Sequence, residues 1–536
     1  MENTERNEAV MYDEEGFDFN VWMQGAMKHT PWWAMSIVSH ALVLIIFAAI
    51  FMPEEAVKEV NAIQYTEYRP PQEIINLDER KLFQDIKIEV PPDEQPDEMK
   101  KPSDHVEADK DEAFDEDFGE KDSISSANWD SEYKNNVIGP GPGAGGPKGK
   151  GRGGDEDLFV PLTAERGKNQ IPVVMNALKW LARHQSPDGS WDSDGFNNMC
   201  KGAPCAGEGY PENDIGVTGL ALLAFLGCGF THFSKDEFDG ISFGKVIRNG
   251  LKYLADHQDK DGCFGPQAGK FMYNHCIAAL AMAEAYGMTE SKLIKEQAQA
   301  GLDFISKAQN SYRAWRYQVR PGDNDTSVTG WAVMALKSGK MAGLAIPQSS
   351  MDGAFAWIQE VTDTNYYSVG YTGKGTGKVY VKDMNENWAG HEALTAVGMM
   401  CRIFTNYNKK DPALEGGAKL LGNDLPVYNT AKQTEKPVDY YYWYYGTMAL
   451  FQFDGPSAKD EKGGKYWREW NPAMQKAIGG SQKTQADGCE FGSWDSDVDR
   501  WGFEGGRVYA TAINALTMEI YYRYPNAFTG GERTTK

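Results

Sequence analysis

The chain lacks the features of several common protein classes. Only 7 of its 536 residues are cysteine, and none of their spacings repeats as a zinc-type Cys-x-x-Cys pair. The 54 basic residues are outnumbered by 77 acidic ones, and the net charge of −23 opposes binding to nucleic acid. We therefore expect no disulfide framework, no metal site, no cofactor and no nucleic-acid partner. Cys200 and Cys205 are close enough in sequence for a local bridge, but their spacing does not require one.

One long apolar run is present. From Trp32 to Met52 the chain reads WWAMSIVSHALVLIIFAAIFM, and no formal charge lies between Lys28 and Glu54. About 20 apolar residues cross the hydrocarbon core of a bilayer, so the pattern predicts one transmembrane helix over 31–52. A cleaved signal peptide is disfavoured because the preceding segment is long and acidic. Lys and Arg are too sparse on either side to set the orientation of the helix.

Two polar residues inside this run share one helix face. Ser36 and His40 are four positions apart, and an ionisable side chain at that depth is costly without a partner or a proton path. The alternative is a neutral histidine tolerated near the membrane interface. An aromatic start, a single span with Ser-x-x-x-His and a long charged spacer together resemble the N-terminus of TonB-type energy transducers. The resemblance implies an inner-membrane protein, with residues 1–30 in the cytoplasm and the chain after residue 53 in the periplasm. It also implies that Ser36 and His40 face an ExbB/ExbD-type motor.

The spacer at 53–157 is acidic and rich in Pro and Gly. It contains PPDEQPDEMKKP, DKDEAFDEDFGEKD and GPGPGAGGPKGKGRGG. Such a composition has too few apolar residues to bury a core. We therefore expect a disordered linker between the predicted membrane helix and the rest of the chain.

From residue 158 onward, apolar helical patterns repeat about every 50 to 70 residues. One set pairs an amphipathic helix with a following turn, and we expect these helices to form an outer layer; the set lies at 177–192, 250–265, 301–317, 353–371, 413–421 and 477–495. The second set is richer in small and apolar residues and is expected to be buried as an inner layer; it lies at 213–227, 274–287, 324–339, 385–400, 439–453 and 506–522.

Six outer and six inner helices predict an all-α fold, an (α/α)6 toroid over 158–530. Each pair cannot bury its apolar face alone, and closing the ring removes the two open ends of a solenoid. An open solenoid is the alternative, but it requires polar capping helices, which the sequence does not offer. We expect the first and last repeats to be neighbours where the ring closes.

The turns after the outer helices share a Gln, an Asp-Gly and an aromatic residue. They read QSPDGSW, QDKDGCF and QKTQADGCEFGSW, and we expect each Gln to tie its turn to the helix end while the aromatic residue covers it. These turns are similar to the QW motifs of the squalene-hopene cyclase and prenyltransferase superfamily. The resemblance implies an α/α toroid, which in that superfamily serves several activities.

Each activity of that superfamily makes a chemical demand. A class II cyclase protonates an alkene with an Asp-x-Asp-Asp acid kept neutral by its neighbours, and the nearest match is Asp495, Asp497 and Asp499, whose spacing differs. The Asp, Cys and His zinc set of prenyltransferases and the thioester motif are not found in the sequence. The acidic sequence GSWDSD occurs at 189–194 and again at 492–497. Neither copy is followed by the remaining residues of an EF-hand, so we expect helix-capping roles for them rather than a Ca²⁺ site.

Several polar residues fall at or near the starts of the inner helices. A toroid would point them toward one central cavity with the tyrosine run at 440–445; the candidates are Asp214, His275, Asp325, His391, Tyr444 and Arg507. The alternatives are helix caps for the two aspartates and satisfied core groups for the two histidines. We therefore expect a membrane-anchored periplasmic toroid that binds a small molecule or a protein. The alternative is a cyclase-like enzyme acting on a polyprenyl chain.

Overall fold

A computed structural model of the chain describes residues 40, 170–374, 392–406, 408–430, 438–456, 460 and 462–523. The chain divides into two units, 1–104 and 105–536, and every described residue except His40 belongs to the second. Among the described residues, no helix is both long and apolar enough to cross a membrane. The predicted membrane helix at 31–52 lies outside the described residues except for His40, and the predicted linker lies wholly outside them.

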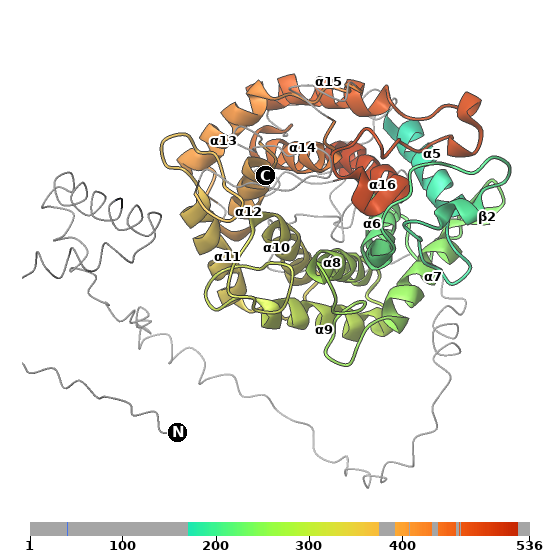
Figure 1. The fold of residues 1–536 in the computed structure, drawn as a ribbon, viewed down its shortest axis with the longest axis horizontal. Helices are drawn as coiled ribbons and strands as arrows, with labels where there is room; N and C mark the ends of the chain where they lie inside the picture. Colours follow the sequence, from blue (N-terminus) through green and yellow to red (C-terminus); the bar gives the residue numbers. More distant parts are fainter. Residues whose placement is uncertain are drawn as a thin grey trace, which may run out of the picture. The chain divides into compact units, whose positions relative to one another are not determined.

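Twelve α-helices of the described region form two concentric layers (Figure 1). The outer helices are α5 (Gln170–Arg183), α7 (Phe243–Asp256), α9 (Lys292–Ala308), α11 (Gln348–Val361), α13 (Pro412–Asn423) and α15 (Lys465–Gly479). The inner helices are α6 (Asp214–Gly227), α8 (Phe271–Thr289), α10 (Thr326–Met341), α12 (Ala393–Asn406), α14 (Tyr440–Asp454) and α16 (Gly502–Arg523). A short hairpin precedes α7, formed by the two-residue strands β1 (Glu237–Phe238) and β2 (Ile241–Ser242).

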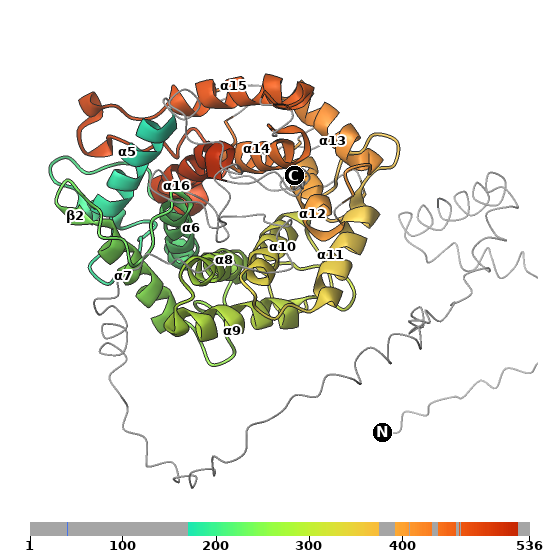
Figure 2. The ribbon, with the colours of Figure 1, turned by 180° about the vertical axis from the view of Figure 1, so that it is seen from behind.

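The inner helices form a closed ring. Each packs against the next in chain order, and α16 packs against α6, so the last repeat meets the first (Figure 2). The outer layer also closes, because α15 contacts α5. The predicted (α/α)6 toroid and the neighbouring of its first and last repeats are therefore confirmed.

Burial explains why the two layers differ in sequence. The inner helix α10 is buried on all sides from Thr326 to Gly339, whereas the outer helix α7 buries only a stripe of residues three and four apart. Small residues allow the inner helices to approach closely. A Cβ added at Gly219 of α6 would lie 3.0 Å from the backbone nitrogen of Ala278 in α8. The small-residue pattern thus marks the inner layer, as predicted.

A glutamine clamp joins successive outer helices. The Nε2 of Gln185 donates to the Gly189 carbonyl of its own turn at 3.0 Å and to the Val246 carbonyl of the next outer helix at 2.8 Å. The same pair of bonds recurs three times, from Gln258 to Gly262 and Gln297, from Gln309 to Arg313 and Ser350, and from Gln482 to Gly492 and Val173. The glutamines therefore tie the turns as predicted, and they also reach the neighbouring repeat.

Glycine is required at one position of these turns. Gly189, Gly262 and Gly492 have φ of 94°, 95° and 96°, a region that L side chains rarely adopt. A Cβ at each would also lie within 2.5 Å of a carbonyl oxygen in the next outer helix. In the last repeat this glycine is Gly492, not the Gly488 of the Asp-Gly pair, because the short helix η4 (Gln485–Glu490) is inserted into the turn.

The turn also binds the inner helix through a recurring threonine. The backbone N–H of Trp191 donates to the hydroxyl of Thr218 in α6 at 2.9 Å, and Thr329, Thr395 and Thr511 accept equivalent bonds in α10, α12 and α16. The indole of Trp191 donates back to the Leu181 carbonyl at 2.8 Å. The turn after α5 therefore links its own outer helix, the next outer helix and an inner helix.

The helix boundaries differ from the sequence expectation in two ways. Each outer helix except α13 begins at least five residues before the segment expected from sequence, at 170, 243, 292, 348 and 465. The inner helix expected over 385–400 runs instead from Ala393 to Asn406. This later start places Thr395 in the first turn of α12, where it accepts from the Val369 amide.

Replacing Gln482 with alanine should weaken the closure of the outer layer. The change removes one hydrogen bond within the last turn and one from that turn to α5, and buried carbonyls left without donors cost about 1–3 kcal/mol. The free energy of unfolding, measured by denaturant titration, should fall by this amount. Gln485→Ala, an exposed site in the same turn, serves as the control and should leave it unchanged. Equal stability of the two variants would contradict the clamp.

Candidate functional site

The starts of the inner helices meet at one end of the ring, which we call the mouth. Asn274 near the start of α8 donates to Asn213, which precedes α6, at 3.1 Å. Lys270, before α8, pairs with Glu504 in the first turn of α16 at 3.3 Å. Tyr273 of α8 hydrogen-bonds Ser327 of α10. These contacts show that the inner helices present their N-terminal ends to the same face.

Asp325 is the most enclosed carboxyl group of the mouth. It caps α10, and its Oδ1 accepts from the Val328 amide at 2.8 Å and the Ser327 hydroxyl at 2.7 Å. The hydroxyl of Tyr371 donates to its Oδ2 at 3.4 Å, and Tyr371 in turn hydrogen-bonds Tyr317. Burial raises the pKa of Asp325 to about 6, although the bonds from Ser327 and Val328 act in the opposite direction. The group can therefore change charge near neutral pH.

Basic and aromatic side chains surround this carboxyl group. The Arg316 guanidinium lies 5.2 Å from the Tyr317 ring and 6.0 Å from the Tyr371 ring, and it pairs with Asp323. The ammonium of Lys270 lies 5.6 Å from the Tyr317 ring. Arg316, Lys270 and Asp323 remain partly exposed. The mouth thus places charges of both signs beside aromatic rings.

Asp214 lies at another point of the mouth. It is the first residue of α6, and its Oδ1 accepts from the Ser193 amide at 2.8 Å. Burial raises its pKa to about 7, and nearby Asp192 and Asp194 add to the shift. Asp192 itself accepts from the amides of Asp194 and Gly195, the local capping role expected for the first acidic turn.

Two buried carboxyl groups approach each other between α14 and α16. Asp439 caps α14 by accepting from the Tyr442 amide at 2.7 Å. Asp499 accepts from the Tyr440 amide at 2.6 Å and from the Trp501 amide at 3.0 Å. Burial, and then the charge of Asp439, raise the pKa of Asp499 well above its usual range. The surroundings of Asp499 therefore disfavour its charged form.

The other two candidate acids have different environments. Asp495 is paired with Lys483 at 2.9 Å and with Arg507 at 2.7 Å. Burial alone would raise the pKa of Asp495, but the hydrogen bonds and charges of Lys483 and Arg507 outweigh it and lower the pKa. Asp497 is exposed. Of the three, only Asp499 combines burial with a raised pKa.

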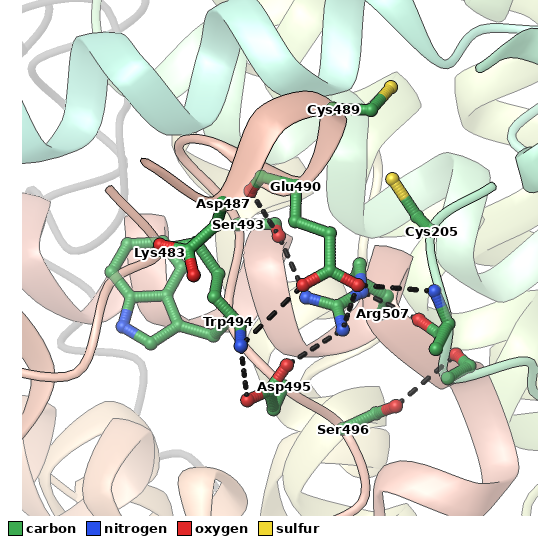
Figure 3. Close-up of polar contacts among 12 residues, drawn as sticks. Cys205, Lys483, Asp487, Cys489, Glu490, Ser493, Trp494, Asp495, Ser496 and Arg507 are labelled. Carbon is green, nitrogen blue, oxygen red and sulfur yellow. Dashed lines mark hydrogen bonds and ion pairs between the residues drawn. The ribbon is translucent and has the colours of Figure 1, made fainter. Parts of the chain in front are cut away.

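Arg507 joins the last repeat to the first (Figure 3). Its Nε donates to the Ala206 carbonyl at 2.6 Å, and its Nη1 donates to the Ser493 hydroxyl at 2.9 Å. Its Nη2 lies 3.0 Å from Glu490 and 2.7 Å from Asp495. This buried side chain has all its nitrogen atoms engaged within the protein, so it braces the place where the ring closes, which we call the seam.

Two further predicted residues lie within the packing. His275 occupies in α8 the place that threonine holds in other repeats: its Nδ1 accepts from the Phe264 amide at 3.0 Å, and its Nε2 donates to the Gly301 carbonyl at 3.1 Å. Burial lowers its pKa to about 4. Tyr444 is buried and stacks on Trp331 of α10 at 5.9 Å. His391 and Ser36 lie outside the described residues, and of the predicted membrane helix only His40 is described.

Sequence reasoning did not select Asp439, Tyr317 or Tyr371. Asp439 precedes a tyrosine-rich inner helix, and an acid in front of an apolar helix is a signal that capping rules offer. Tyr317 and Tyr371 come from loops, and only the tertiary structure brings them to Asp325. The sequence pattern also did not point to a cluster of His184 with Cys200, Cys205 and Cys489, whose ligand atoms lie within 4.8 Å of one another.

No family model and no curated protein matches the chain. Among solved structures, it is similar to the type II terpene cyclase MstE from Scytonema, with 12% identity over 66% of this chain and 97% of the other and a TM-score of 0.41. It is also similar to the GH76A α-1,6-mannanase of Salegentibacter sp. HEL1_6, with 10% identity over 66% and 98% and a TM-score of 0.42. Similarities of this degree assign no substrate or activity to the chain.

Asp325→Asn should change how stability depends on pH. A folded-state pKa of about 6 against about 3.9 in the unfolded chain makes the wild type lose stability as pH rises from about 4 to about 7. Asparagine keeps the acceptor for Val328 but carries no charge. Between pH 4 and pH 8, the unfolding free energy of the wild type should therefore fall by up to about 3 kcal/mol relative to that of the variant. A difference that is constant with pH would contradict the assigned environment.

Proposed function

We propose that the chain is a membrane-anchored binding protein whose toroid engages a small-molecule or protein ligand at its mouth. The helix at 31–52 anchors it in the inner membrane, with the N-terminus cytoplasmic and the toroid periplasmic. Ser36 and His40 face an ExbB/ExbD-type motor that energises the protein. The proposal for the anchor rests on the uncharged apolar run and the Ser-x-x-x-His spacing.

The proposal for the mouth rests on one observation, the charged and aromatic group around Asp325. Arg316, Lys270 and Asp323 stay partly exposed beside the rings of Tyr317 and Tyr371. A few fixed polar groups among aromatic faces are typical of ligand sites. By contrast, the polar groups of Arg507 and His275 are fully used within the protein.

Site-specific photo-crosslinking in intact membranes tests both parts of this proposal. Tyr317 is replaced by p-benzoylphenylalanine in the full chain, and the matched control replaces Tyr286, an equally half-buried residue near the other end of α8. Irradiation should give an adduct from position 317 and none from 286. Adducts from both positions or from neither would contradict a site at the mouth.

The same membranes report on the anchor. The full chain should stay in the membrane after alkaline extraction, and external protease should reach the toroid only when the outer membrane is opened. The same crosslinking residue at position 36 should trap a motor subunit. Extraction into the soluble fraction would remove the anchor from the proposal while leaving the result at position 317 intact.

Acid catalysis on a polyprenyl substrate is a second candidate, favoured by the pair Asp439 and Asp499. A carboxylic acid kept neutral by burial and a neighbouring acid can protonate an alkene, and the amides of Tyr440 and Trp501 would then hold the resulting carboxylate. The ring centroids of Tyr441 and Trp501 are 6.5 Å apart, and Trp501 is the residue whose amide binds Asp499. Aromatic rings that could stabilise a carbocation therefore lie near this acid.

Incubating the full chain with squalene and with shorter polyprenyl substrates tests this candidate. If it is correct, mass spectrometry should detect a cyclised product that falls at least about 100-fold in Asp499→Asn, since the proton donor is lost. Asp497→Asn, an exposed acid two residues away, should leave the product unchanged. The absence of product from the wild type, or equal loss in both variants, would exclude Asp499 as the acid.

A further inference from the structure

The seam contains a compact group of one imidazole and three thiols. The Nε2 of His184 lies 3.4 Å from Sγ of Cys200, 3.6 Å from Sγ of Cys205 and 3.5 Å from Sγ of Cys489. All four ligand atoms lie within 4.8 Å of one another. His184 and Cys205 are buried, and Cys200 and Cys489 are half-buried.

These distances match tetrahedral coordination of zinc. Zn–S bonds of about 2.3 Å and a Zn–N bond of about 2.0–2.1 Å at tetrahedral angles place nitrogen and sulfur about 3.6 Å apart. The three observed N···S distances, 3.4 to 3.6 Å, agree with this value. One imidazole and three thiols also form a closed four-ligand set, the composition of structural zinc sites.

The surroundings of His184 orient it as a metal ligand. Its Nδ1 donates to the Trp180 carbonyl at 2.8 Å, which leaves the lone pair of Nε2 free to face the three sulfur atoms. The ring also stacks on Trp180 at 4.1 Å. In zinc sites, a hydrogen bond to the second ring nitrogen fixes the tautomer and the ring plane of a histidine ligand.

The sulfur of Cys200 has a supporting hydrogen bond. The Cys205 amide donates to Sγ of Cys200 at 3.2 Å, a bond that stabilises a thiolate. Zinc with three thiolates and a neutral imidazole carries one net negative charge. Two arginines, Arg183 and Arg507, lie close enough to His184 to interact with it electrostatically, and Arg183 donates to the Phe491 carbonyl. Their positive charges would offset the negative charge of the zinc site.

The ligands come from opposite ends of the folded chain. His184 directly follows α5, and Cys200 and Cys205 lie in the loop between α5 and α6. Cys489 lies in η4, the segment inserted into the last turn. Figure 3 shows Cys205 and Cys489 beside the Arg507 network that joins the same two repeats. A metal at this place would connect residues more than 300 positions apart, where ring closure is otherwise noncovalent.

We propose that His184, Cys200, Cys205 and Cys489 bind one zinc ion, which staples the first repeat of the toroid to the last. The site is structural, because the protein supplies all four ligands and leaves no position for a substrate. It holds Cys200 and Cys205 as thiolates instead of the local disulfide that their spacing permits. This inference is independent of the ligand at the mouth and of the membrane anchor.

Metal analysis of the full chain, purified anaerobically in detergent, tests the proposal. The wild type should carry one zinc per chain, and Co²⁺ replacing it should give the visible bands of a tetrahedral thiolate site. Cys489→Ser should bind zinc at least about 100-fold more weakly in competition with a chelator, since even loss of an outer-shell partner costs about 10–100-fold. Cys401→Ala removes a buried thiol elsewhere and should keep the metal.

A conservative variant guards against simple misfolding. Cys489→His keeps four ligands and should retain one zinc per chain with an altered cobalt spectrum. Zinc should raise the melting temperature of the wild type and of Cys489→His, but not that of Cys489→Ser, because only a bound ion stabilises the folded chain. A reduced wild type that takes up no zinc, unchanged affinity in Cys489→Ser, or a Cys200–Cys205 disulfide in the anaerobically isolated chain would overturn the proposal.

Discussion

The toroid depends on one repeated interaction, a glutamine amide that donates to two carbonyl groups at once and joins α5 to α7, α7 to α9, α9 to α11 and α15 to α5. One acceptor lies in its own turn and the other in the next outer helix, so each clamp fixes the angle between successive repeats. A ring of six repeats closes only if those angles add up correctly. The clamp from Gln482 to Val173 is the one that spans the closure, and it has the same geometry as the others.

The clamp also explains where polar groups collect. The turns before α6, α10, α12 and α16 are bound to these inner helices through a threonine, and the turn before α8 through His275, so the starts of these helices lie at one end of the ring. Helix N-termini favour acidic caps. Packing six of them together buries several carboxyl groups and raises the pKa values of Asp214, Asp325 and Asp499. The chemistry of the mouth therefore follows from the architecture.

The seam differs from the other junctions because its two repeats carry extra segments. The loop after the first turn and the helix η4 in the last turn both pack there. Arg507 binds both of them, reaching Ala206 on one side and Glu490 on the other. The added contacts are placed where closure brings together the two ends of the ring, which share no direct chain connection.

The sequence by itself determined the number of helices, their inner and outer layers, the turns and the closure of the ring. These depend on apolar periodicity and on short turn motifs, in which Gln185 binds the carbonyl of Gly189 four residues along the chain. It also predicts the membrane helix, which lies outside the described residues except for His40. Only the tertiary structure decided that the pKa of Asp499 is raised while that of Asp495 is lowered, and that His275 braces a turn. It alone brought His184 to three cysteines, because burial, ion pairing and ligand geometry are set by residues up to 305 positions away.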